Sequence, residues 1–290
     1  METVYIDGQY LPREDAKISV FDHGLLYGDG IFEGIRAYGG RIFKLDRHLE
    51  RLFHSAELID LQIPLTREEL REVILEVCRK NHVQDGYIRP IVTRGAGTLG
   101  LDPRRCGTPT LIVIAATLPP LYGEKSSEGL RLIASSWRRN PPQALNPNIK
   151  SLNYLNNILA MLEVIEKGMD EAIMLDMEGY VSEGTADNVF IHNGSKFISP
   201  PVETNLPGIT RETAIELIKE RGWQFEEGKF RMDDIYSARE IFLTGTAAEI
   251  APVVEVDSHR VGDGAPGERT KELMASYKEL VRSAGTPIYD

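Results

Sequence analysis

The stretch Asn148-Ile149-Lys150-Ser151-Leu152-Asn153-Tyr154-Leu155-Asn156-Asn157 places one lysine where a proline-punctuated segment gives way to an apolar helical pattern. Leucines recur at helical spacing from Leu152 onward, which predicts a helix over residues 152–167. Lys150 would then lie at the N-terminus of this helix, where the helix dipole disfavours positive charge. An enzyme that forms an imine with its substrate needs a fixed amine that can lose its proton. The same pattern also fits an ordinary solvated lysine at a helix start.

The composition is that of an ordinary globular protein. Its 290 residues are enough for two domains, and 42% of them are hydrophobic. The formal charge of −11, from 33 basic and 44 acidic residues, argues against a nucleic-acid partner. Two cysteines, Cys78 and Cys106, cannot build a disulfide framework. No apolar stretch approaches membrane-spanning length and the start resembles no signal peptide, so we expect a cytoplasmic protein with no membrane partner.

Short strands and helices follow one another without regular alternation, which favours an α+β fold over a doubly wound sheet. A change in composition near Pro119 predicts a domain of residues 1–117, an interdomain loop of residues 118–129 and a larger domain of residues 130–290. The expected strands are 4–6, 9–11, 31–38, 41–43, 87–94, 109–116, 130–136, 171–176, 180–181, 188–192, 196–199 and 240–244, and the expected helices are 45–59, 66–80, 152–167, 210–221 and 269–283.

One motif points toward a dinucleotide cofactor. Gly95-Ala96-Gly97-Thr98-Leu99-Gly100 matches the G-x-G-x-x-G fingerprint and follows a predicted strand. The fingerprint works only when a helix begins there and directs its N-terminus at a pyrophosphate. Pro103, Gly107 and Pro109 exclude a helix of useful length. We therefore expect a mobile or surface-covering loop over residues 95–107.

Two turns could bind an anion. Leu206-Pro207-Gly208-Ile209-Thr210-Arg211-Glu212 sets a Pro-Gly turn before a predicted helix, with Thr210 placed as its cap. Thr244-Gly245-Thr246-Ala247-Ala248-Glu249 offers hydroxyls and backbone amides after an apolar strand. An ordinary capped helix and an ordinary tight turn are the alternatives. Two such sites in one chain are more informative than either.

Three further groups could act on a ligand. Arg51 lies beside the apolar face of the helix predicted over residues 45–59, where its guanidinium could grip a phosphate or simply reach solvent. Glu183 leaves a strand among small residues and could hold a ring nitrogen protonated, or could be a solvated turn residue. Tyr87 and Arg89 share one strand face and could meet a carboxylate or form a structural pair.

Taken in order, these pieces resemble the class IV, fold-type IV pyridoxal-phosphate aminotransferases, and most of all the branched-chain amino acid aminotransferases. The resemblance implies an α+β fold with a smaller N-terminal α/β domain and a larger mixed α/β pseudo-barrel domain. It also implies transfer of the amino group of leucine, isoleucine or valine to 2-oxoglutarate. The segments that carry it are 27–36, 87–90, 148–155, 182–184, 188–190, 206–211 and 245–250.

The resemblance assigns the cofactor site. Lys150 would form the imine with pyridoxal phosphate and carry the proton between the substrate Cα and cofactor C4′. Glu183 would pair with the pyridine nitrogen, so that the ring can act as an electron sink. Tyr154, four residues after Lys150 and hence on the same face of the predicted helix, would bond the phenolic oxygen. The phosphate would be held by Arg51, Ile209, Thr210 and Thr246, and no metal is implied.

The same resemblance assigns the substrate site and the partner. Tyr87 with the amides of Thr246 and Ala247 would receive the α-carboxylate, supported by Arg89. An apolar pocket would come from Tyr27, Phe32 and Tyr154. Leu99 and Leu101 would reach into a neighbouring subunit's site, which implies a homodimer or a higher homo-oligomer. Either Arg89 or Arg36 would serve the γ-carboxylate of 2-oxoglutarate.

Alternatives remain open. Lys150-Ser151-Leu152-Asn153 is also similar to the lysine segment of the D-amino acid aminotransferases, and aminodeoxychorismate lyase shares the cofactor site. Phe32-Glu33-Gly34-Ile35-Arg36 and Tyr87-Ile88-Arg89 favour the branched-chain group. A dinucleotide-dependent oxidoreductase that uses the 95–100 segment is the alternative from another class.

Overall fold

The structure, a computed structural model, describes residues 2–119, 121–123 and 125–289 and confirms the expected α+β class. These residues divide into two compact units. The first unit contains 2–119, 149–153 and 281–289, and the second contains the described residues of 121–148 and 154–280. This division differs from the predicted domains because 149–153 and 281–289 pair with strands of the first unit.

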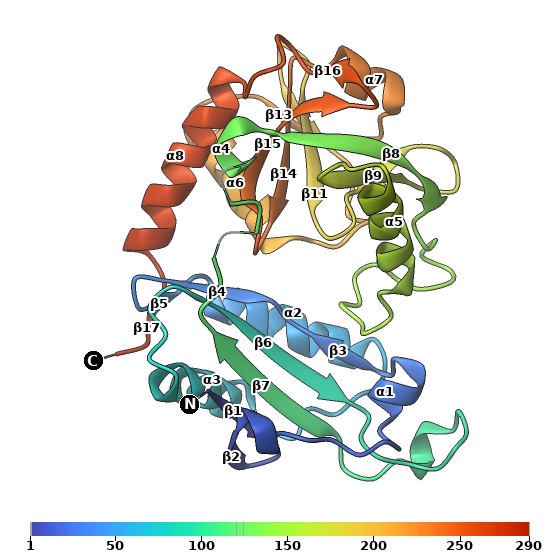
Figure 1. Cartoon of the computed structure of the whole chain (residues 1–290), viewed down its shortest axis with the longest axis vertical. Coiled ribbons are helices and arrows are strands. Elements are labelled where there is room, and N and C mark those ends of the chain that lie inside the picture. Colours follow the sequence, from blue (N-terminus) through green and yellow to red (C-terminus); the bar gives the residue numbers. More distant parts are fainter. Residues whose placement is uncertain (1, 120, 124, 290) are drawn as a thin grey trace. The chain divides into compact units, whose positions relative to one another are not determined.

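The first unit is an antiparallel sheet with helices on one face (Figure 1). Its strands lie in the order β17–β5–β4–β6–β7–β1–β2, and β3 also pairs with β6. The strands are β1 (Thr3–Ile6), β2 (Gln9–Pro12), β3 (Gly30–Phe32), β4 (Ile35–Tyr38), β5 (Arg41–Ile42), β6 (Gly86–Thr93), β7 (Thr110–Ala116) and β17 (Thr286–Pro287), and the helices are η1 (Arg13–Asp15), α1 (His23–Tyr27), α2 (Leu45–Glu57), α3 (Arg67–Lys80) and η2 (Pro103–Arg105). The core lies between the sheet and the helices α2 and α3.

Local sequence signals account for much of this unit. Asp7 and Gly8 both have positive φ and join β1 to β2, as the two-residue hairpin signal predicts. Thr66 caps α3 and exchanges hydrogen bonds with Glu69 in a capping box. The strand expected over residues 31–38 is wrong in one respect, because it is interrupted at Glu33 and Gly34. Both of its halves still pair with β6.

The second unit is a mixed sheet with the strand order β10–β9–β8–β15–β14–β11–β12–β13, and β16 pairs with β15. The strands are β8 (Leu130–Arg138), β9 (Glu171–Leu175), β10 (Val181–Glu183), β11 (Asn188–His192), β12 (Phe197–Ser199), β13 (Phe225–Glu227), β14 (Glu240–Gly245), β15 (Glu249–Val256) and β16 (His259–Arg260), and the helices are α4 (Lys125–Glu128), α5 (Leu155–Glu166), α6 (Ile209–Glu220), α7 (Met232–Ser237) and α8 (Glu268–Ser283), whose last residues belong to the first unit. The sequence analysis did not predict β15, which lies near the centre of this sheet, between β8 and β14.

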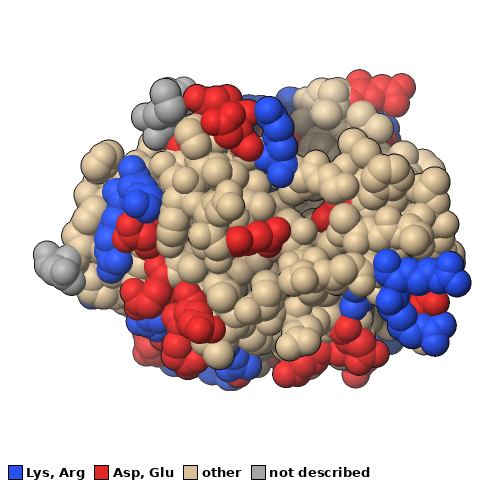
Figure 2. All heavy atoms as spheres, turned by 90° about the horizontal axis from the view of Figure 1, so that it is seen from below, with Lys and Arg blue, Asp and Glu red and all other residues tan. Residues whose placement is uncertain are grey.

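On the face in Figure 2, basic and acidic residues lie mostly toward the rim, and a few acidic residues interrupt the broad area of other residues between them. Within the described part of the chain, no helix combines the length and apolarity that a membrane crossing requires.

The 95–107 segment forms a loop, as expected, with only the short η2 inside it. The glycine fingerprint therefore has no helix N-terminus to offer a pyrophosphate.

Candidate active site

Lys150 lies in an extended segment of the first unit. The Phe32 N–H donates to the Lys150 carbonyl oxygen at 2.9 Å, and the Leu152 N–H donates to the Gly30 carbonyl oxygen at 2.9 Å. The Lys150 N–H donates to Ser55 Oγ of α2 at 3.2 Å. These bonds fix the lysine main chain to both β3 and α2. The main chain at Lys150 is therefore fixed in place, while its long side chain can still move.

The helix predicted from residue 152 begins later than expected. It is α5, which starts at Leu155 with Tyr154 as its N-cap. The preceding residues pair with β3, and Asn153 Nδ2 donates to the Gly28 carbonyl oxygen at 2.8 Å. Lys150 is therefore outside the helix, so the helix dipole does not act on it as we reasoned. The inference that Tyr154 shares a helix face with Lys150 is wrong for the same reason.

A cationic and aromatic cluster surrounds Phe32 of β3. The Lys150 Nζ lies 4.8 Å from the centre of the Phe32 ring, and the guanidinium carbon of Arg89 lies 4.5 Å from it. Arg89 Nη2 donates to Tyr87 Oη at 2.8 Å, which confirms that these two residues share one face of β6. Because this oxygen accepts from Arg89, the phenolic proton can be donated elsewhere. The cluster offers a hydroxyl donor and two cations beside an apolar ring.

Gly34 makes room for this hydroxyl. A Cβ at Gly34 would lie 2.0 Å from Tyr87 Oη, far inside van der Waals contact. The interruption between β3 and β4 therefore has a role, because it brings a residue without a side chain against the Tyr87 hydroxyl. Only glycine fits there without moving Tyr87.

A buried charge cluster anchors Arg51. Its Nε donates to Glu33 Oε1 at 2.7 Å and its Nη2 to Glu33 Oε2 at 2.9 Å, while His48 Nδ1 lies 2.8 Å from Glu33 Oε2. The side chain of Glu33 is fully buried and that of Arg51 is 9% exposed. Burial would raise the pKa of Glu33, but Arg51 and His48 outweigh burial and hold that pKa well below its usual range.

The same cluster lowers the pKa of His48. Burial lowers its pKa, Glu33 opposes that shift, and the charges of Arg51 and Lys150 add to it. Since the ionised Glu33 can only accept, His48 Nδ1 is the donor in this contact. Sequence reasoning missed Glu33 and His48, although an acidic residue inside an apolar strand pattern was a usable signal. It found Arg51 but not the Glu33 carboxylate, whose two oxygens accept hydrogen bonds from the Arg51 guanidinium and orient it.

The remaining first-unit candidates are more dispersed. Tyr27 ends α1 and packs edge-on against His23, with ring centres 5.0 Å apart. Arg36 is buried in β4, and its Nη2 donates to the Leu118 carbonyl oxygen at 3.4 Å. Leu99 and Leu101 lie in the 95–107 loop and are strongly exposed. Leucines so exposed are candidates for contact with another chain.

Glu183 ends β10 in the second unit, and donors from two segments of this unit contact its carboxylate. Arg139 Nη2 lies 2.7 Å from Glu183 Oε1, and the Leu206 N–H donates to Glu183 Oε2 at 3.3 Å. The side chain of Glu183 is only 7% exposed. The alternative interpretation of Glu183 as a solvated turn residue is therefore wrong. Sequence reasoning gave no hint of Arg139.

The N-terminus of α6 has no side-chain cap. Its N-cap is Gly208 and no side chain caps it, so the expectation that Thr210 is the cap is wrong. Ile209 and Thr210 instead form the buried first turn. Asn188 Nδ2 donates to the Leu206 carbonyl oxygen at 2.9 Å, and a Cβ at Gly208 would lie 2.0 Å from Asn188 Oδ1. The Asn188 side chain therefore lies directly against Gly208, at the start of the helix.

The turn between β14 and β15 carries Thr246 and Ala247. The Leu121 N–H donates to the Ala247 carbonyl oxygen at 3.3 Å. Behind the turn, a Cβ at Gly245 would lie 1.8 Å from Asp187 Oδ1, and the Tyr122 hydroxyl donates to Asp187 Oδ2 at 2.9 Å. A buried carboxylate therefore lies directly against the turn at Gly245.

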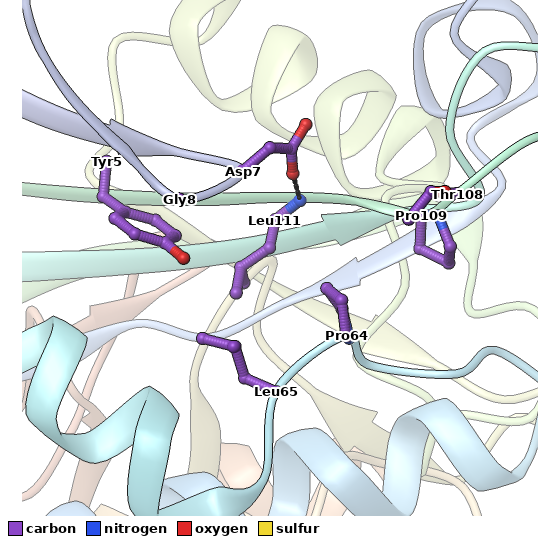
Figure 3. A pocket seen from close by; sticks show the side chains of 8 residues that line it. All are labelled: Tyr5, Asp7, Gly8, Pro64, Leu65, Thr108, Pro109 and Leu111. Atoms are coloured by element: carbon purple, nitrogen blue, oxygen red, sulfur yellow. Dashed lines mark hydrogen bonds between the residues drawn. The ribbon is translucent and has the colours of Figure 1, made fainter.

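A cavity of about 330 Å³ lies elsewhere in the first unit (Figure 3). Tyr5, Pro64 and Leu65 are among its mostly apolar lining, and the Leu111 N–H donates to the Asp7 carboxylate there at 2.7 Å. None of the predicted site residues lines it.

The sequence profile described as amino-transferase class IV matches residues 30–256. A protein of Methanocaldococcus jannaschii, provisionally named a branched-chain-amino-acid aminotransferase, is 49% identical over 288 residues, 99% of each chain. Two crystal structures of the T.th. branched-chain amino acid aminotransferase are each 38% identical and cover 97% of this chain and 94% of theirs. They have TM-scores of 0.93 with pyridoxamine 5'-phosphate and 0.91 with N-(5'-phosphopyridoxyl)-L-glutamate.

Proposed function

Because this chain belongs to the class IV aminotransferases, we propose that it exchanges the amino group of leucine, isoleucine or valine with 2-oxoglutarate. The products are the branched-chain 2-oxo acids and L-glutamate. The observation that carries the proposal is the cluster of Lys150, Phe32, Tyr87 and Arg89. It combines an amine, a carboxylate-binding donor pair and an apolar ring. The complex of a 38% identical relative with N-(5'-phosphopyridoxyl)-L-glutamate supports glutamate as one substrate.

The cofactor is pyridoxal 5'-phosphate, which supplies an electron sink for the substrate Cα. Lys150 would hold it covalently before the substrate binds and, as a free amine afterwards, would move the proton at the substrate Cα. Glu183 pairs with the ring nitrogen, and Tyr154 donates to the phenolic oxygen. The N-terminus of α6, which no side chain caps, would offer the Ile209 and Thr210 amides to a phosphate dianion. Arg51 and Thr246 are the other phosphate residues in this proposal.

The residues assigned to the substrate have complementary roles. Tyr87 donates its phenolic proton to the α-carboxylate, together with the amides of Thr246 and Ala247. Arg89 orients that hydroxyl and adds positive charge. Phe32, Tyr27 and Tyr154 exclude water from the substrate side chain, and Arg89 or Arg36 receives the γ-carboxylate of 2-oxoglutarate.

We also propose that the chain acts as a homodimer or a larger homo-oligomer in the cytoplasm. Leu99 and Leu101 are exposed in the first unit. In the second unit α5 exposes an apolar stripe at helical spacing, which consists of Leu155, Ile158, Leu162 and Ile165. A monomer rarely leaves such stripes in water. Cys78 and Cys106 are both free thiols, which suits a reducing compartment.

The absorption spectrum of the purified protein tests the function. Protein saturated with pyridoxal phosphate should show a visible band that L-leucine removes and that 2-oxoglutarate then restores. Lys150→Ala protein should lack both responses. A band that responds to D-leucine alone indicates the D-amino acid enzyme, and pyruvate release from aminodeoxychorismate indicates the lyase. A protein that binds a nicotinamide dinucleotide and forms no such band would refute the proposal.

A further inference from the structure

Arg139 joins two elements that carry proposed cofactor contacts. It follows β8 directly, and its N–H donates to the Leu175 carbonyl oxygen of β9 at 2.9 Å. Its side chain is 13% exposed. Neither the sequence patterns nor the roles assigned above include it.

The two terminal nitrogens of the Arg139 guanidinium bind different elements. Nη2 forms the 2.7 Å ion pair with Glu183 Oε1 at the end of β10. Nη1 donates to the side-chain oxygens of Asn156 at 3.1 Å and Asn157 at 3.2 Å, both in the first turn of α5. A planar guanidinium holds such partners in a fixed geometry, which an ammonium on a flexible stem cannot do.

The two asparagines are themselves held. Asn156 Nδ2 donates to the Arg138 carbonyl oxygen at 2.8 Å, and Asn157 Nδ2 donates to the Thr185 carbonyl oxygen. The start of α5 is therefore bonded to the end of β8 and to the segment that follows β10. Tyr154 is the N-cap of this same helix.

We propose that Arg139 is a positioning residue that fixes Glu183 relative to the Tyr154 end of α5. This inference rests on the proposed function, in which Glu183 and Tyr154 contact the ring nitrogen and the phenolic oxygen of one rigid ring. The spacing between those two contacts must then match the ring. Arg139 sets that spacing, and it also places a positive charge behind Glu183 at the nitrogen end of the ring.

The test compares Arg139→Met with Arg139→Lys, and Arg138→Met is the matched control. Arg138 is the preceding residue, and it is exposed. Apoprotein is titrated with pyridoxal phosphate to give the dissociation constant, and the visible band of the loaded protein is titrated with pH. Thermal unfolding of each apoprotein shows whether it is folded.

Arg139→Met should raise the cofactor dissociation constant about tenfold or more, the effect of losing one well-placed hydrogen bond to a charged group. Loss of the positive charge should raise the pH midpoint of the band by about half a unit or more. Arg139→Lys should restore the midpoint toward the wild-type value while affinity stays reduced, because one ammonium cannot bind both elements. Arg138→Met should match the wild type.

A wild-type dissociation constant and midpoint in Arg139→Met would overturn the inference. If Arg139→Met does not fold, a wild-type dissociation constant in Arg139→Lys would overturn it instead. A change in thermal stability alone, with both readouts unchanged, would also overturn it. If the wild-type protein itself binds no pyridoxal phosphate, the proposed function fails first. The two failures are therefore distinct.

Discussion

The buried Glu33 carboxylate should contribute far more to stability than any surface ion pair of α2. Glu33→Gln keeps the shape of the side chain but removes its charge. It also turns an amide N–H₂ toward donors of Arg51 and His48, which lie 2.7–2.9 Å from the carboxylate oxygens. Removing one partner of a buried ion pair typically costs about 3–5 kcal/mol. We expect a loss of this size in the free energy of unfolding.

Urea unfolding of the apoprotein, followed by circular dichroism, measures this loss. With a denaturant slope of about 1–3 kcal/mol/M, the midpoint should fall by at least about 1 M. The matched control is Glu50→Gln, which breaks the exposed pair of Arg47 with Glu50 on the same helix. That change should cost about 0–1 kcal/mol.

A double-mutant cycle measures the interaction free energy between Glu33 and Arg51 separately from their contacts with other residues. Glu33→Gln combined with Arg51→Met should cost less than the sum of the two single changes, because the double variant leaves no half of the pair behind. A loss for Glu33→Gln no larger than that for Glu50→Gln, or strictly additive losses, would refute the reasoning.

Three other outcomes follow from the same geometry. The pKa of His48 is lowered in the folded protein, so below the ordinary pKa of about 6.5 the unfolded chain binds more protons at this residue than the folded protein does. The free energy of unfolding should therefore fall as the pH falls below that value. In His48→Gln, Tm should therefore decrease less steeply as the pH is lowered, and the same dependence of Tm on pH as in the wild type would contradict this. Gly34→Ala should displace the Tyr87 hydroxyl and raise KM for L-leucine by about tenfold, the value of one hydrogen bond to a charged group, as Tyr87→Phe should. A wild-type KM in both variants would count against the carboxylate assignment. Leu162→Lys with Ile165→Lys should shift the sedimenting species toward monomer, and an unchanged size would exclude the α5 stripe as an interface.

The parts of the fold that sequence reasoning found are those governed by short-range signals. The Asp7–Gly8 hairpin, the Thr66 cap of α3 and the shared face of Tyr87 and Arg89 each depend on residues within a few positions of one another. The start of α5 was misplaced because the preceding residues pair with β3. Helical periodicity contains no information about such a distant partner.

By itself, the sequence determined the α+β class, the resemblance to class IV aminotransferases and the identity of the lysine and glutamate in the proposed site. Tertiary structure alone decided that Lys150 lies in an extended segment, that Glu33 orients Arg51, and that Arg139 joins Glu183 to α5. The physical reason is the range of the interactions. Periodicity and capping act within one element, whereas a buried charge takes its partner from whichever element the folded chain packs against it.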